Sequence, residues 1–91
     1  MRKRATIIVT GVVQSVGFRA YTIRQARALG VCGYVRNLAS GAVEIVSEGS
    51  EDTLQRLIEW AGRGPPLSRV EDVVVEFADP TGEFSDFSVE Y

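Results

Sequence analysis

At 91 residues, with 45% apolar and 24% charged side chains, the chain has room for one domain, residues 1–91, around one hydrophobic core. A single cysteine, Cys32, excludes an internal disulfide, and the absence of histidine excludes a histidine general base, a Ser-His-Asp triad and the common zinc ligand sets. The net charge of −2 argues against a generic nucleic-acid binder.

The first half of the chain predicts a strand, a helix and a β-hairpin. Residues 5–13 are β-branched and apolar, which is typical of a strand buried on both faces. An apolar stripe at helical spacing follows over 18–29, and Gly30 stands where a helix ends. Alternating residues over 31–38 and 42–48, with small turn residues between them, predict the hairpin.

The second half predicts a helix and two strands. Ser50 is suited to cap a helix over 51–61, whose apolar residues recur at i, i+3, i+4 and i+7, and two prolines after Gly64 prevent its continuation. A strand over 69–77 has all its valines on the apolar side, and a short final strand lies within 84–91. This order predicts an α+β fold, the ferredoxin-like split βαβ (βαββαβ) sandwich, with one antiparallel sheet and two helices on one face.

The turn between the first strand and the first helix, residues 14–19, has the chemistry to hold a phosphate. The amino end of a helix and a tight turn both present backbone N–H groups to an anion. The segment contains no proline, Gly17 permits a close approach of the backbone, and Arg19 adds a planar fork of donors that matches two phosphate oxygens. Because the segment is not a Walker A loop, its local chemistry alone leaves open an ordinary turn whose arginine points to water.

This segment is part of a longer pattern that resembles the acylphosphatase family. The two most specific stretches are Gly11-Val-Val-Gln-Ser-Val-Gly-Phe-Arg19 and Gly33-Tyr-Val-Arg-Asn37. The resemblance covers nearly the whole chain in the same order. Its other matching residues are Ala26, Leu29, Gly30, Gly41, Val43, Glu44, Gly49, Gly64, Pro65, Pro66, Phe84, Phe87, Val89 and Tyr91.

The resemblance implies hydrolysis of acyl phosphates to a carboxylate and inorganic phosphate, with no metal or other cofactor. It implies that Arg19 and backbone N–H groups bind the phosphoryl oxygens, and that Asn37 orients the attacking water. An oxygen of the phosphate would accept the proton of the water, and the carboxylate leaving group needs no general acid. The catalytic residues carried over are Arg19 and Asn37, and the substrate-binding residues are Gln14, Ser15, Val16, Gly17 and Phe18.

Three residues merit separate expectations. Ser15 stands where the family usually has glycine; if the position requires a left-handed backbone, serine costs about 1–2 kcal/mol there. We then expect weaker phosphate binding than in a Ser15→Gly variant, unless the hydroxyl adds a donor to the phosphate. Tyr34 replaces a frequent tryptophan, which is a conservative packing change. Cys32 is expected to be a small hydrophobic side chain on a strand rather than a reactive thiol.

The charge distribution leaves alternatives open. Residues 1–43 carry seven Arg or Lys and no acid, whereas residues 44–91 carry all twelve acids and three arginines. An anionic ligand is therefore expected to meet the first half of the chain. One alternative is a non-catalytic ferredoxin-like module that binds RNA or a protein partner, although the aromatic sheet motif used for base stacking is absent. Another is a stand-alone relative of the acylphosphatase-like domain of larger carbamoyl-transfer maturation proteins.

The sequence also carries expectations about location and partners. Its first residues do not read as a secretory signal, and no run reaches the roughly 20 apolar residues of a membrane span, so we expect a cytoplasmic protein. We expect a monomer that takes a small-molecule acyl phosphate, with no nucleic-acid partner and no membrane partner.

Overall fold

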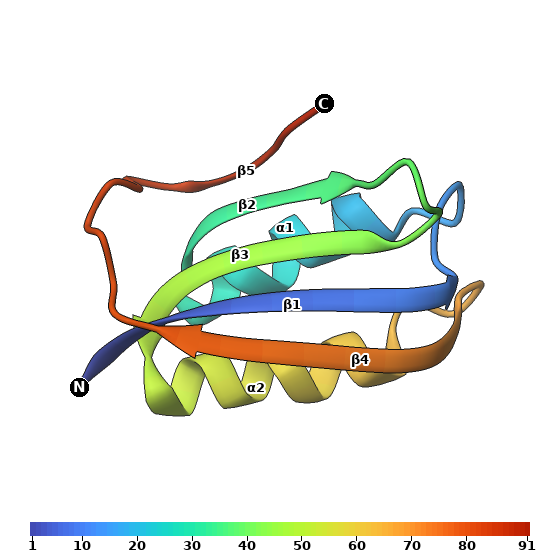
Figure 1. The fold of residues 1–91 in the computed structure, drawn as a ribbon. Coiled ribbons are helices and arrows are strands. Elements are labelled where there is room, and N and C mark those ends of the chain that lie inside the picture. Colours follow the sequence, from blue (N-terminus) through green and yellow to red (C-terminus); the bar gives the residue numbers. More distant parts are fainter.

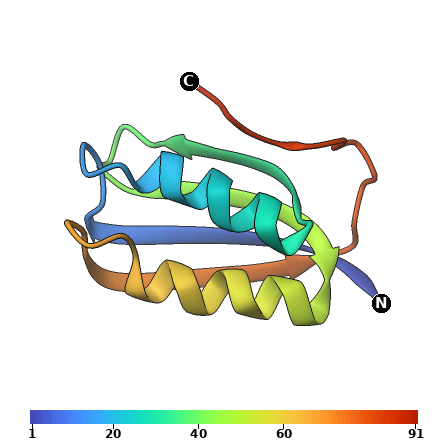
Figure 2. The same cartoon turned by 180° about the vertical axis from the view of Figure 1, so that it is seen from behind.

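The computed structural model describes residues 1–91 and contains one five-stranded sheet, whose arrangement is drawn in Figure 1. The two helices cover one face of the sheet (Figure 2), which confirms the ferredoxin-like sandwich. Neither helix has the length and the apolar character that crossing a membrane would require. The elements are β1 (Arg2–Val12), α1 (Phe18–Leu29), β2 (Cys32–Asn37), β3 (Val43–Ser50), α2 (Glu51–Arg63), β4 (Arg69–Ala78) and β5 (Phe87–Val89).

The strands lie in the order β4-β1-β3-β2-β5. β1 pairs antiparallel with β3 and with β4, and β2 pairs antiparallel with β3. The short β5 pairs parallel with β2, so the sheet is mixed and not antiparallel throughout as the sequence predicted. The reason is the crossover 79–86, which carries the chain from one edge of the sheet to the other, so that β5 starts at the same end as β2 (Figure 1).

The core lies between the helices and the face of the sheet that they cover. On β1, Ala5, Ile7 and Val9 are fully buried, while the residues between them are partly exposed. The prediction of a strand buried on both faces is therefore wrong, because both helices pack on the same face. On β4 the same alternation leaves Val74 50% exposed, on the opposite face from its neighbouring valines.

Both helices begin where the sequence predicts and end within two residues of the predicted positions. Gly30 ends α1 with a left-handed backbone, and the side chain of Ser50 caps α2 by accepting a hydrogen bond from the N–H of Thr53 at 3.2 Å. The ring of Phe18 lies 5.4 Å from the ring of Trp60, a core residue that the sequence analysis did not single out. This contact joins the two helices at the first turn of α1.

The crossover between β4 and β5 is anchored by Glu48, a fully buried carboxylate on β3. Its oxygens accept hydrogen bonds from the N–H and the hydroxyl of Thr81, at 2.8 and 2.9 Å, and from the N–H of Gly82 at 3.0 Å. Burial raises the pKa of this carboxyl, but these hydrogen bonds and the nearby Arg4 outweigh burial and hold the pKa below its ordinary value. Glu48 thus fixes the segment that leads into β5.

We predict that Glu48→Gln lowers the free energy of unfolding by about 2 kcal/mol at neutral pH, since a hydrogen bond to a charged acceptor is worth about 1.5–3 kcal/mol. Because the folded pKa lies below the unfolded one, the advantage of the parent is full above the ordinary pKa of 4.5. It is lost as the pH falls through the lower folded value. Urea unfolding of both proteins between neutral pH and about pH 3 checks this. A difference that grows on acidification would contradict it.

Candidate active site

An open pocket of about 340 Å³ lies at the end of the sheet where β1 and β2 finish. The turn after β1, the start of α1, the last residue of β2 and residues at the end of the chain all line it. Its polar lining comprises Ser15, Arg19 and Asn37, together with the backbone of Gly17. The structure therefore brings both residues that the sequence analysis selected as catalytic, Arg19 and Asn37, to one pocket.

The turn that leads into α1 is left-handed at two positions. Ser15 has a φ of 62° and is the one non-glycine residue with a positive φ. Gly17, directly before α1, has a φ of 79° and a ψ of 12°. A Cβ added to Gly17 would meet only the ring of Tyr21, at 3.6 Å, so the backbone angle rather than the available space favours glycine there. Ser15 therefore meets the condition under which serine is costly.

The backbone N–H groups of residues 14–19 donate to no other protein atom. The first intrahelical bond comes later, from the N–H of Tyr21 to the carbonyl of Gly17 at 3.1 Å. Successive free N–H groups in a turn with left-handed residues form a concave cradle for anions, and the helix dipole adds a partial positive charge. The segment can therefore bind an oxyanion.

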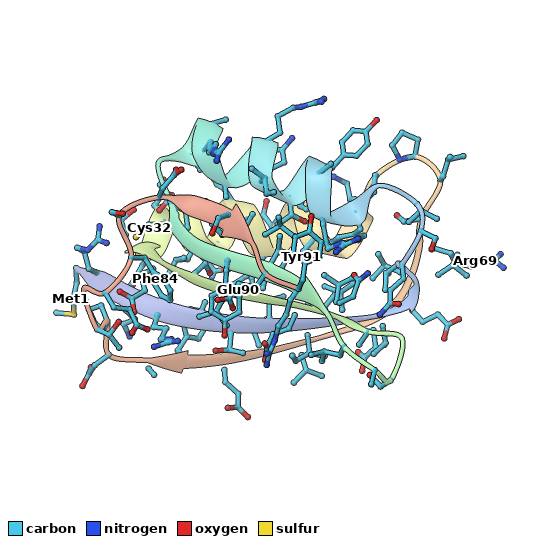
Figure 3. All side chains as sticks on the ribbon, turned by 90° about the horizontal axis from the view of Figure 1, so that it is seen from above. Met1, Cys32, Arg69, Phe84, Glu90 and Tyr91 are labelled. Carbon is cyan, nitrogen blue, oxygen red and sulfur yellow. The ribbon has the colours of Figure 1, made fainter.

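Arg19 lies in the first turn of α1, half-buried, and no carboxylate forms a salt bridge with it. Its guanidinium carbon lies 5.4 Å from the centre of the ring of Tyr91, which Figure 3 labels just beyond β5. Such a stacked contact is worth about 0.5–1 kcal/mol at an exposed site and leaves the in-plane N–H donors free. Arg19 can therefore present its fork of donors to two anionic oxygens.

Asn37 is the last residue of β2. Its Oδ1 is buried and has no hydrogen-bond partner, and no other buried side-chain nitrogen or oxygen lacks one. An unpaired buried acceptor costs about 1–3 kcal/mol, so a fold retains one where the atom has a role. This oxygen can accept a hydrogen bond from a molecule that enters the pocket.

The other residues predicted to bind substrate lie in the same turn, but their side chains serve the fold. The ring of Phe18 is 1% exposed and belongs to the core beneath the pocket. Val16 packs against the core and does not line the pocket. Gln14 donates its side-chain amide to the β2–β3 loop. These three residues can reach an anion through their backbone N–H groups.

The same pocket has an apolar wall that was not predicted from the sequence. Ile23, on the second turn of α1, belongs to this wall. It lies four positions after Arg19 and therefore on the same helix face, so this spacing could have revealed it. The wall residues near β5 could not be placed without knowing the strand pairing. The apolar lining consists of Val13, Phe18, Ala20, Ile23, Val89 and Tyr91.

Known proteins are similar to this chain over nearly its whole length. Residues 5–89 match the family model described as Acylphosphatase. The acylphosphatase of Pelotomaculum thermopropionicum is 47% identical over 90 residues, which cover 99% of this chain and 98% of that protein. The crystal structure of acylphosphatase from Bacillus subtilis superposes with a TM-score of 0.94 at 37% identity, covering 98% of this chain and 99% of that chain. An acylphosphatase from Coxiella burnetii superposes with a TM-score of 0.92 at 36% identity, covering 98% of this chain and 93% of that chain.

We predict that Ser15→Gly raises the free energy of unfolding by about 0.5–1 kcal/mol, because glycine avoids the left-handed cost but has more backbone entropy in the unfolded chain. The same relief is expected to lower the inhibition constant of inorganic phosphate. Denaturant unfolding and steady-state inhibition measure the two effects. The matched control is Ser15→Ala, which keeps the Cβ and removes the hydroxyl. If both variants raise the inhibition constant, the hydroxyl is a phosphate donor and the explanation of affinity by strain is wrong.

Proposed function

This chain belongs to the acylphosphatase family and hydrolyses acyl phosphates to a carboxylate and inorganic phosphate, and from that premise we propose that the cradle of residues 14–19 holds the phosphoryl group while Asn37 directs the water. The observation that carries this proposal is the meeting of three sets of unpaired groups at one pocket. They are the backbone N–H groups of the turn, the guanidinium of Arg19 and the Oδ1 of Asn37.

In the proposed complex, the phosphoryl oxygens accept hydrogen bonds from the free N–H groups of the turn and from Arg19. The cradle offers directional donors, and the guanidinium supplies the full positive charge that a dianion needs in a partly enclosed site. Phosphoryl transfer passes through a loose transition state, with charge spread over the equatorial oxygens. Fixed donors around those oxygens therefore stabilise the transition state without any covalent contribution from the protein.

The attacking water donates a hydrogen bond to the Oδ1 of Asn37 and approaches phosphorus opposite the acyl oxygen. The bond from water oxygen to phosphorus forms as the bond from phosphorus to the acyl oxygen breaks, and the carboxylate leaves with the electron pair. An oxygen of the phosphoryl group accepts the proton of the water. Because a carboxylic acid has a low pKa, the leaving group needs no protonation, and the proposed mechanism uses neither a general acid nor a metal.

The acyl group of the substrate is proposed to lie against the apolar wall formed by Ile23, Val89 and Tyr91. Arg19 is the one cation among the residues that line the pocket, and it faces the phosphoryl group. A second anionic group on the acyl part would therefore find no partner charge. The substrates that fit best are acyl phosphates whose acyl part is apolar. All of these residues come from one chain, so a monomer suffices for the reaction.

The basic first half of the chain does not favour an RNA-binding module over hydrolysis. Several of its arginines are engaged within the protein. Arg24 stacks on Tyr21 at 5.3 Å, and Arg27 pairs with Asp86 at 3.2 Å. Arginines that are satisfied in this way form a weaker basic surface than their number in the sequence indicates.

We predict that Arg19→Gln and Asn37→Ala have different effects. Arg19→Gln removes a charged donor that binds the phosphoryl oxygens in the ground state and binds them more tightly in the transition state, so the inhibition constant of phosphate rises by about tenfold or more and turnover is nearly abolished. Asn37→Ala removes an interaction with water that matters only in the transition state. Phosphate inhibition is then expected to change by less than about twofold, while kcat falls by about 100-fold. Steady-state hydrolysis of benzoyl phosphate in excess chelator, with phosphate as inhibitor, measures both constants.

The matched control is Arg24→Gln, an arginine on the same helix that lies outside the pocket and is expected to leave both constants unchanged. The role given to Asn37 is wrong if Asn37→Ala loses phosphate binding and keeps its turnover number. Activity that disappears in excess chelator would show that the reaction needs a metal.

We predict that benzoyl phosphate is hydrolysed with a kcat/KM about tenfold higher than acetyl phosphate, because partial burial of the ring against the apolar wall adds about 1–2 kcal/mol of binding. Val89→Thr keeps the shape of the side chain and replaces a methyl group by a hydroxyl. It is therefore expected to reduce the preference about threefold while leaving phosphate inhibition unchanged. Competition between the two substrates measures the ratio directly. A ratio near one in the parent would place the acyl group away from this wall.

A further inference from the structure

We propose that Gln14 is a positioning residue for the hydrolysis, which acts on Asn37 through the β2–β3 loop. The Nε2 of Gln14 donates hydrogen bonds to the carbonyl oxygens of Leu38, at 2.8 Å, and Ala42, at 2.9 Å. Leu38 directly follows Asn37 in the chain, and Ala42 lies at the other end of the same loop. In Figures 1 and 2 this loop and the turn after β1 lie side by side at one end of the sheet.

The loop that Gln14 contacts is already closed by its own backbone. The N–H of Leu38 donates to the carbonyl of Ala42 at 2.9 Å, and the N–H of Gly41 donates to the carbonyl of Leu38 at 3.1 Å. Each carbonyl that Gln14 binds therefore has another donor, and loss of the glutamine amide leaves neither unpaired. The hydrogen bonds from Gln14 thus fix the position of the closed loop relative to the cradle, rather than the shape of the loop itself.

The side-chain amide of Gln14 is not available to the substrate in this arrangement. Its two N–H donors are both used on the loop, and the residue does not line the pocket. The backbone N–H of residue 14, by contrast, belongs to the cradle and is retained whatever side chain is present. A substitution of the side chain therefore separates the two contributions of this residue.

The proposed role gives a specific kinetic signature, and it rests on the proposed role of Asn37. The cradle and Arg19 bind the phosphoryl group in both the ground state and the transition state, whereas the in-line water held by Asn37 matters only in the transition state. Displacement of a catalytic group by about 1 Å can cost 100-fold in rate. Loss of the Gln14 hydrogen bonds is therefore expected to lower kcat and to leave KM and phosphate inhibition nearly unchanged.

The test is a double-mutant cycle with Gln14→Met, a side chain of similar length without a donor, in the parent and in Asn37→Ala. In the parent we expect kcat for benzoyl phosphate to fall about tenfold, with the inhibition constant of phosphate changed by less than about twofold. In the Asn37→Ala background we expect no further fall, because the group that Gln14 positions is absent. The matched control is Gln55→Met on the exposed surface of α2, which is expected to change neither constant.

Each other outcome of this cycle overturns the proposal. Equal falls in kcat in both backgrounds would show that Gln14 acts independently of Asn37, and a raised inhibition constant in both would make its amide a substrate ligand. If Gln14→Met does not fold, Gln14→Asn, whose amide is one methylene too short to reach both carbonyls, takes its place with the same expectations. If Asn37→Ala alone keeps its turnover, the role proposed for Asn37 fails, and that failure is read from the single variant.

Discussion

The candidate active site depends on the direction of two strands. β1 and β2 both pair antiparallel with β3, so they run in the same direction and end at the same end of the sheet. The strand register brings the two strand ends close together, because Val43 of β3 is paired with Val9 of β1 on one side and with Asn37 of β2 on the other. The turn after β1 and the loop after β2 must then be neighbours. Strand pairing brings Arg19 and Asn37 to one pocket, and no hydrogen bond joins the two residues directly.

The electrostatics of the site follow from the same layout. No acidic residue lines the pocket, although the chain has twelve. Glu44 of β3 lies opposite Arg36 of β2 and accepts a hydrogen bond from the Arg36 guanidinium at 2.6 Å. This bond raises the pKa of Arg36. Glu44 is one residue from Val43, the partner of Asn37 on β3, and its negative charge is matched by the positive charge of Arg36. An approaching phosphoryl group meets the free N–H groups and Arg19, and no acidic side chain is among the residues that line the pocket.

Local sequence patterns predicted the features that depend on residues close together in the chain. Alternation and helical spacing located the elements, and the turn chemistry of residues 14–19 indicated an anion site. Contacts between distant residues could not be predicted in this way. The hydrogen bonds of Gln14 go to backbone carbonyls 24 and 28 residues away, which have no side-chain signature, and Glu48 meets its partners only after the chain has crossed the sheet. The parallel β5 was missed for the same reason, since its direction is set by the crossover.

The turn itself divides its residues between two tasks. The side chains of Val16 and Phe18 pack into the core and hold the turn in place, whereas the side chain of Gln14 positions the neighbouring loop. Residues 15, 17 and 19 line the pocket, as does Phe18. A cradle of backbone N–H groups cannot be altered directly by substitution, because every residue except proline supplies the same donor. Its geometry is therefore set by the side chains that anchor the turn in the core, and the mechanism proposed above depends on them as well as on the groups that would touch the phosphate.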